Sequence, residues 1–433
     1  MTLYQNPEVQ QWAQLCERPQ IELSFLEGSV RNIMNRVRNS GDHALHEITA
    51  QFDKVNIGQL QVDAYEIEAA RNTLESSLKE AIKTAAKNIE LFHASQRRDT
   101  VKIDTMPGVT CWRKSVGIDK VGIYIPGGTA PLFSTVLMLG IPARLAGCNE
   151  VVLCTPPSKD GKINAAILYA ADLVGVTSIF KVGGAQAIAA MAYGTESIPK
   201  VYKIFGPGNQ YVTKAKQLVL EDGVAIDMPA GPSEVLVMAD ETAKPAFVAA
   251  DLLSQAEHGE DSQVILVVLN EKVLNDIKKE IENQLKQLPR KDIAEKALAH
   301  SRIISFNDVD TAIAFVNEYA PEHLIINTRN VDEIAGKIVN AGSVFLGNYS
   351  PEAIGDYASG TNHTLPTNGY AKAYAGVSLE SFMKHITFQQ LTADGLIKLG
   401  PAVERMAEAE QLEGHRQAIS VRLKDIQQSM KGS

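Results

Sequence analysis

The feature that most constrains the fold is a series of short apolar runs that alternate with helical segments. From Lys120 onward, four runs rich in Val and Ile each end in Gly or Pro: VGIYIP (121–126), VVLCTP (151–156), SIFKVGG (178–184) and VYKIFGPG (201–208). Ala- and Leu-rich segments such as AAILYAADLVG lie between them. Strand–helix–strand at this spacing predicts right-handed βαβ units and a parallel sheet.

A second series of the same kind follows the first. Its apolar runs are EVLVMAD (234–240), VILVVL (264–269), HLIIN (323–327) and SVFLG (343–347), separated by amphipathic segments such as EKVLNDIKKEIENQLKQL. A chain of 433 residues is too long for one core. We therefore predict an α/β protein with two Rossmann-like parallel-sheet domains and a cleft between them.

The flanking segments are predicted to be helical extensions. Residues 26–96 carry apolar positions at helical spacing, and beyond about Val377 the chain becomes helical and polar, ending in an amphipathic region that packs on its own subunit or reaches another. The expected division is an N-terminal helical extension at 1–20, a first α/β domain from 21–120 and 235–369, a second from 121–234 and 370–377, and a C-terminal helical tail at 378–433.

Composition excludes several classes of function. Apolar residues at 45% and charged residues at 21% are typical of a soluble globular protein, and a net charge of −9 without a clustered basic face argues against nucleic acid as a partner. The N-terminus shows no secretory signal, and no run approaches the ~18 apolar residues of a membrane span. Four sparse cysteines without a C-x-x-C pair fit a reducing compartment, so we expect a cytoplasmic protein.

A candidate metal site lies in the segment 226–258. Gln255 and His258 are three residues apart near the end of a predicted helix, so they face the same way and could hold one ion. Gln is an unusual zinc ligand, and such pairs are often just solvated helix residues. Asp356, in the turn-rich segment 348–367, could complete a mixed nitrogen and oxygen shell.

The pair Glu322-His323 is the candidate for proton transfer. It follows a predicted helix (Val309–Ala320) and a proline, at the mouth of a strand, and an imidazole beside a carboxylate can act as a general base near neutral pH. Alternatively, Glu322 caps the strand and His323 points to solvent. Neighbouring strand residues face opposite ways, so a shared role requires an irregular backbone here.

Nucleotide binding is suggested by Gly-rich turns after the strands, where backbone amides can approach phosphate. None matches G-x-G-x-x-G, and these glycines could merely end strands. We reject the cysteines as nucleophiles, because Cys148 lies at a helix end and Cys154 inside a core strand. His415 adjoins Gly414, a possible helix break. The turns are Pro126-Gly127-Gly128, Gly183-Gly184 and Gly206-Pro207-Gly208-Asn209, and the histidines set aside are His43, His46, His93, His300 and His385.

Taken together, these segments make the chain resemble the histidinol dehydrogenase family over nearly its whole length. The segment 226–258 is similar to the family signature, with Ile-Asp, then Ala-Gly-Pro-Ser-Glu, and a final Glu-His. The motifs YIPGG, GPGN, PEH and GDYASGTNH occur in the family's order. Several motifs in one order are far more specific than any one of them.

The resemblance implies a homodimer with a shared zinc site. The zinc ligands would be Gln255, His258, Asp356 and the partner subunit's His415, and Glu322 and His323 would be the catalytic pair. The ligands and His323 would also contact the substrate, together with Ser233, Tyr357, His363 and the partner subunit's Glu410. NAD would be bound by Tyr124, Gln186 and Asn209.

The implied reaction converts L-histidinol through enzyme-bound L-histidinal to L-histidine, the last steps of histidine biosynthesis, with two NAD. His323 would act as the general base, and Glu322 would activate water for attack on the aldehyde. Two alternatives stay open. The chain could be a zinc-stabilised nucleotide-binding or scaffold protein without turnover, or a relative that oxidises another amino alcohol, because the pocket sets substrate choice.

Overall fold

The structure is a computed structural model that describes residues 1–19, 24–127, 131–229 and 231–431. The chain divides into two compact units. The first comprises residues 1–96 and 118–382, and the second comprises residues 97–117 and 383–433. No helix among the described residues is long and apolar enough to cross a membrane.

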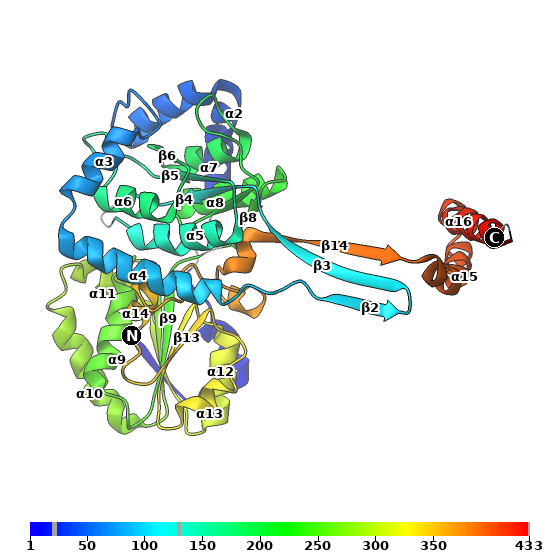
Figure 1. Cartoon of the computed structure of the whole chain (residues 1–433). Coiled ribbons are helices and arrows are strands. Elements are labelled where there is room, and N and C mark those ends of the chain that lie inside the picture. The colour runs from blue at the N-terminus through cyan, green and yellow to red at the C-terminus, as the bar shows by residue number, and fades with distance from the viewer. Residues whose placement is uncertain (20–23, 128–130, 230, 432–433) are drawn as a thin grey trace. The chain divides into compact units, whose positions relative to one another are not determined.

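The first unit contains a six-stranded sheet in which all neighbouring strands are parallel, in the order β1-β11-β10-β9-β12-β13 (Figure 1). Alternate residues of β9 point to opposite faces: Val235 and Val237 pack with α9 and α10, whereas Leu236 and Met238 pack with α1 and α12. The strands are β1 (Thr2–Gln5), β9 (Glu234–Ala239), β10 (Gln263–Val268), β11 (Arg302–Ser305), β12 (His323–Asn327) and β13 (Ser343–Leu346). The helices are α1 (Val9–Leu15), α9 (Pro245–Ala256), α10 (Glu271–Leu285), α11 (Lys291–Ala299), α12 (Val309–Tyr319), α13 (Val331–Ala335) and α14 (Glu352–Tyr357).

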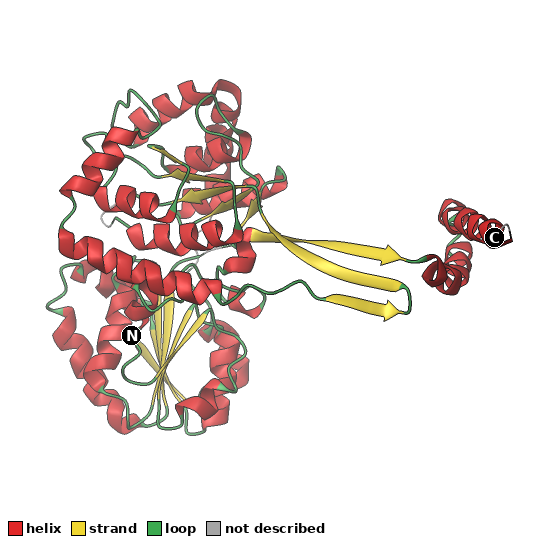
Figure 2. Cartoon of the chain, viewed as in Figure 1, coloured by secondary structure: helices red, strands yellow, loops and turns green. Residues whose placement is uncertain are grey.

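The same unit contains a five-stranded parallel sheet in the order β6-β5-β4-β7-β8. Its strand order reverses between β4 and β7, as in doubly wound folds. Figure 2 shows helices on both faces of the two parallel sheets. The strands are β4 (Lys120–Tyr124), β5 (Glu150–Cys154), β6 (Ser178–Phe180), β7 (Lys203–Phe205) and β8 (Ala225–Ile226). The helices are α2 (Ser24–Phe52), α3 (Ala64–Thr73), α4 (Ser76–Ala94), α5 (Phe133–Ala146), α6 (Ala165–Val174), α7 (Gly184–Tyr193) and α8 (Gln210–Glu221).

Two parallel sheets covered by helices confirm the predicted fold class, and each apolar run of the two predicted series contains a strand. Three strands of these two sheets were not predicted, β1, β8 and β11, of which β1 and β8 lie at sheet edges. The domain borders proposed from the sequence remain predictions, since the compact units divide the chain differently.

The second unit corrects the expected C-terminal helical tail. The tail does contain α15 (Ala393–Ala409) and α16 (Glu413–Lys431), but it begins with β14 (Met383–Leu391). This strand pairs antiparallel with β3 (Val109–Gly117), which also pairs with β2 (Lys102–Met106). The alternating, β-branched and aromatic residues of MKHITFQQL favour an extended strand once a partner is present. Two 3₁₀ turns, η1 (Tyr370–Lys372) and η2 (Leu379–Phe382), precede β14 in the first unit.

Candidate active site

The backbone before β12 brings Glu322 and His323 to the same side. Ala320 ends α12 in the left-handed region, with φ of 52°, and Glu322 lies in a bend outside the strand. Strand alternation therefore does not separate the two side chains, which are 6% and 3% exposed. His323 Nδ1 lies 3.6 Å from Glu322 Oε2. The irregular backbone that a shared role requires is thus present.

Both side chains are held by the backbone of Glu234, the first residue of β9. The Glu234 N–H donates to Glu322 Oε2 at 2.9 Å, and the Glu234 carbonyl oxygen lies 3.2 Å from His323 Nδ1. A carbonyl can only accept, so the neutral imidazole carries its proton on Nδ1 and its lone pair on Nε2. That lone pair is what a general base needs.

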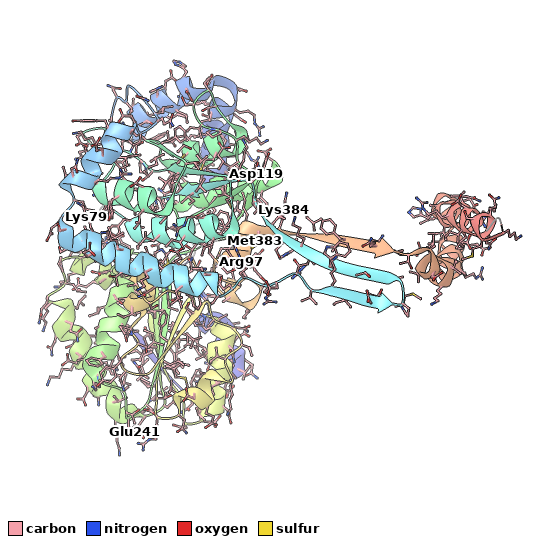
Figure 3. The ribbon with its side chains drawn as sticks, in the orientation of Figure 1. Lys79, Arg97, Asp119, Glu241, Met383 and Lys384 are labelled. Atoms are coloured by element: carbon pink, nitrogen blue, oxygen red, sulfur yellow. The ribbon has the colours of Figure 1, made fainter. Side chains whose placement is uncertain are left out.

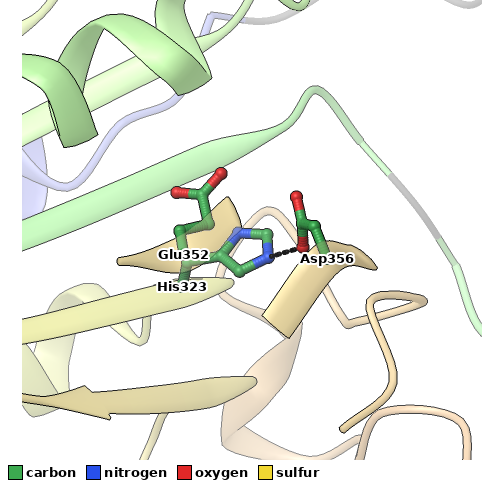
Figure 4. A group of neighbouring side chains, drawn as sticks. All are labelled: His323, Glu352 and Asp356. Atoms are coloured by element: carbon green, nitrogen blue, oxygen red, sulfur yellow. Dashed lines mark ion pairs between the residues drawn. The ribbon is translucent and has the colours of Figure 1, made fainter. Parts of the chain in front are cut away.

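Two carboxylates from α14 flank the His323 ring (Figure 4). Single ligand atoms of His323, Glu352 and Asp356 all lie within 4.8 Å of one another. His323 Nε2 is 3.3 Å from Asp356 Oδ1, yet this contact lacks hydrogen-bond geometry, and neither Nε2 nor Glu352 Oε2 bonds to any described residue. Buried polar atoms without partners point to a ligand that the site is built to hold.

The predicted ligand Gln255 lies against this cluster. It is buried on α9, and with its amide nitrogen toward Glu352 it donates to Oε1 at 2.5 Å, while its oxygen lies 3.0 Å from the Glu234 nitrogen and shares that N–H with Glu322 Oε2. His258 lies two residues beyond the end of α9 and on the surface, so the expected helical pair is interrupted. Asp356 is on a short helix, α14, and not in a loop as predicted.

Burial and charge shift the pKa values of this cluster. Burial raises the pKa of Glu322 to about 8. Burial alone lowers the pKa of His323, but the charges of Glu352 and Glu322 and the contact with Asp356 raise it well above its ordinary value. Burial also raises the pKa of Glu352 to about 8. The surrounding carboxylates therefore stabilise the positive charge that the imidazole acquires when it accepts a proton.

The remaining residues predicted to contact the substrate differ from one another in burial and in hydrogen bonding. His363 Nδ1 donates to the Asp356 carbonyl oxygen at 2.8 Å, and its Nε2 lies 3.0 Å from Thr135 Oγ1. Ser233 directly precedes β9, and Tyr357, the last residue of α14, is exposed. Glu410 and His415 belong to the second unit, where they lie exposed at the end of α15 and in the first turn of α16.

The candidate site lies at the amino ends of its strands, contrary to the expectation for α/β sheets. Glu234 begins β9, and His323 begins β12. At the opposite, carboxyl edge, Glu241 follows β9 and points outward (Figure 3). The rule that places ligands at carboxyl ends rests on helix N-termini and Gly-rich turns. Here the irregular segments before β9 and β12 provide the polar groups, so the site forms at the other edge.

The five-stranded sheet follows the usual rule. A cavity of about 840 Å³ lies beyond the carboxyl ends of its strands and is lined by Tyr124, Gln186 and Asn209, the three residues predicted to bind NAD. A Cβ at Gly206 would collide with the carbonyl oxygen of Tyr124, so this turn requires glycine at φ of 119°. Gly127 and Gly184 also line the cavity, whereas Gly128 lies outside the described residues.

Several residues of the site were missed by sequence reasoning. Glu352 was missed although it lies four residues before the predicted ligand Asp356 on α14, because this helical spacing is hidden in a turn-rich segment. His93, which was set aside and does not belong to this cluster, is buried, with Nδ1 3.2 Å from Gln96 Oε1 and Nε2 3.4 Å from the amide of Asn362. No local signal marks Glu234. The rejection of the cysteines agrees with their chemistry, since burial raises the pKa of the Cys148 thiol to about 12.

The fold and the site together define an oxidoreductase of the α/β class, with a nucleotide-sized cavity on one sheet and a proton-accepting cluster on the other. A family model described as histidinol dehydrogenase matches residues 16–423. The chain therefore belongs to the histidinol dehydrogenase family, NAD-dependent oxidoreductases that act on histidinol.

Individual relatives agree with the family model. A histidinol dehydrogenase of Bacteroides fragilis (strain YCH46) is 62% identical over 426 residues, covering 98% of this chain and 100% of the relative. A chloroplastic histidinol dehydrogenase of Arabidopsis thaliana is 55% identical over 416 residues, covering 95% and 89%. The crystal structure of histidinol dehydrogenase from Elizabethkingia anophelis has a TM-score of 0.97 and 56% identity, with 99% of both chains covered.

Proposed function

We propose that the chain oxidises L-histidinol to L-histidine through enzyme-bound L-histidinal, using zinc and two NAD. The observation that supports this most strongly is His323, a buried imidazole with an orphaned Nε2 between two carboxylates. Family membership supplies the substrate class. A cytoplasmic location remains the prediction drawn from the sequence.

Zinc would be held by Gln255, His258, Asp356 and the partner subunit's His415. Two nitrogen and two oxygen donors form an acceptable zinc shell. The Gln255 oxygen accepts one hydrogen bond from Glu234 and keeps a second lone pair. In this arrangement Glu352 orients Gln255 through its amide N–H, a common role for a carboxylate behind a metal ligand.

A competing metal set consists of His323, Glu352 and Asp356, which the structure places close together. It shares Asp356 with the proposed set. We favour the proposed set because the competing one would occupy the His323 lone pair that proton abstraction requires. Metal content of single variants separates the two sets, as described in the Discussion.

When bound, zinc would fix the substrate's amine and imidazole nitrogens, and NAD would accept one hydride in each oxidation. His323 Nε2 takes the hydroxyl proton as the alcohol becomes the aldehyde. Glu322 takes a proton from water as the water oxygen bonds to the aldehyde carbon, and this proton then passes to the former carbonyl oxygen, giving the hydrate. His323 releases its first proton to solvent and then takes a second one as the hydrate becomes the carboxylic acid. Each oxidation thus releases one proton to the protein.

Substrate recognition would complete the shared site. Ser233, Tyr357 and His363 would contact the substrate from one subunit, and the partner subunit's Glu410 from the other. Tyr124, Gln186 and Asn209 would bind NAD in the cavity that they line. Because the aldehyde is reactive, retaining it between the two oxidations avoids loss to side reactions.

One assay separates this function from its alternatives. Purified protein is incubated with NAD and either L-histidinol or an amino alcohol without an imidazole, and NADH formation is followed by absorbance. The proposal predicts NADH from L-histidinol and far less from the other alcohol. A scaffold protein would form none, and Glu322→Gln and His323→Ala would alter its stability only. A relative with another substrate would prefer the second alcohol.

A further inference from the structure

Glu234 connects the proposed proton acceptors to a buried ion pair outside the site. Its backbone contacts Glu322 and His323, whereas its carboxylate, 1% exposed, faces the other way toward Arg18. In the register of β9 and β12, His323 lies opposite Val235, which places Glu234 beside Glu322. A displacement of Glu234 would therefore disturb both proton acceptors at once.

Arg18 donates two hydrogen bonds to the Glu234 carboxylate. Its Nε donates to Oε2 at 2.7 Å, and a terminal nitrogen donates to Oε1 at 3.2 Å. The guanidinium group lies 3.6 Å from the ring centre of Tyr319. The Tyr319 hydroxyl donates in turn to Gln263 Oε1 at 2.8 Å. A bidentate pair of this kind fixes orientation as well as distance.

The same arginine also holds the segment that leads into the catalytic pair. It donates to the carbonyl oxygen of Tyr319 at 2.5 Å, at the end of α12 where carbonyl groups lack helical partners. Tyr319 precedes Glu322 by three residues, across the left-handed Ala320. Arg18 thus contacts both chain segments that carry the proton-transfer geometry, although it lies in the N-terminal segment after α1.

Stability alone gives a weak reason for this arrangement. Both side chains are nearly inaccessible, at 7% for Arg18 and 1% for Glu234. Desolvating two charges offsets much of their attraction, and apolar residues of similar volume often stabilise a core equally well. What an apolar pair does not supply is a fixed orientation.

We propose that the Arg18–Glu234 ion pair is a positioning device for the active site, which holds the Glu234 peptide where its N–H orients Glu322 and its carbonyl oxygen sets the tautomer of His323. This inference rests on the proposed roles of Glu322 and His323. Arg18 and Glu234 are positioning residues and do not touch the reacting atoms.

The test compares Arg18→Met, Arg18→Lys and Glu234→Gln in the full-length protein. For each variant, kcat and KM are measured with L-histidinol and with L-histidinal, and thermal unfolding is recorded. We expect kcat of Arg18→Met to fall roughly 10- to 100-fold in both oxidations, because small misplacements of catalytic groups have effects of that size. KM for NAD should stay within about twofold, since the cavity for NAD lies elsewhere. Arg18→Lys should recover part of the loss.

A matched control removes another ion pair of low exposure. Lys181 Nζ lies 2.8 Å from Glu66 Oε1, with side chains 11% and 23% exposed. Lys181→Met should lower the unfolding midpoint without lowering kcat. Slowing of both oxidations in Arg18→Met is a readout that a purely stabilising pair would not produce.

The contrary result is a less stable Arg18→Met protein with kcat within twofold of the unaltered chain, which would make the ion pair structural only. If Arg18→Met does not fold, the same comparison of kcat with thermal stability is made on Arg18→Lys and Glu234→Gln, and it distinguishes the positioning role from a purely structural one. Glu322→Gln and His323→Ala are measured alongside. Full activity in Glu322→Gln and His323→Ala would refute the proposed function itself. Inactive Glu322→Gln and His323→Ala beside fully active Arg18 variants would refute only the positioning role.

Discussion

The raised pKa of Glu322 predicts how the second oxidation responds to pH. A carboxyl group that activates water must be ionised, and burial raises the pKa of Glu322 to about 8. Such a group is ionised to about one-tenth at pH 7 and about nine-tenths at pH 9. The rate of histidinal oxidation should therefore rise about tenfold over this range. Replacing Glu322 by Gln should remove the rise and slow this step by about 10²- to 10⁴-fold.

The assay is a rapid-mixing measurement of NADH formed from L-histidinal with NAD in excess, at half-unit intervals from pH 6.5 to 9.5. Oxidation of L-histidinol, in which Glu322 takes no proton, serves as the internal reference. Glu322→Gln should slow the aldehyde step more than the alcohol step. A flat profile in the unaltered protein, or equal slowing of both steps in the variant, would refute the role of Glu322.

Three further predictions concern the metal, the dimer and the buried side chain of His93. His258→Ala should lose bound zinc by elemental analysis while Glu352→Gln retains it with weaker affinity, and the reverse result would favour the competing set of His323, Glu352 and Asp356. Mixing inactive His415→Ala with inactive His323→Ala under conditions of proven subunit exchange should restore activity through hybrid dimers, and no recovery would place His415 within its own subunit's site. Burial lowers the pKa of His93 in the folded protein, so the unfolded chain binds a proton at higher pH than the folded one, and the free energy of unfolding should fall as the pH drops below about 6.5. In His93→Gln, the free energy of unfolding should depend less steeply on pH between pH 7 and 5.5. The same pH dependence in both proteins would contradict this.

Local sequence patterns predicted most of the first unit. Runs such as VGIYIP and EVLVMAD combine β-branched residues with a terminal turn, and each forms a buried parallel strand. The β14 strand could not be predicted in the same way, because its stability comes from pairing with β3, more than 260 residues earlier. Pairing over such distances leaves no trace in a short window.

The residues of the candidate site could be predicted where they are neighbours in the sequence. Glu322-His323 stands out as a pair, and the structure provides the irregular backbone that a shared role needs. Glu234 and Arg18 could not be found in this way, because their contacts join segments 216 residues apart. Glu352 was missed because α14 is short and lies among turn formers, so its helical spacing to Asp356 was not apparent.

The stoichiometry of the complete reaction tests the central claim most directly. A limiting amount of L-histidinol is converted with excess NAD, and NADH and L-histidine are both quantified at completion. We predict two NADH for each L-histidine, with no L-histidinal in free solution. One NADH for each L-histidinol consumed, with L-histidinal accumulating, would contradict a single site that performs both oxidations.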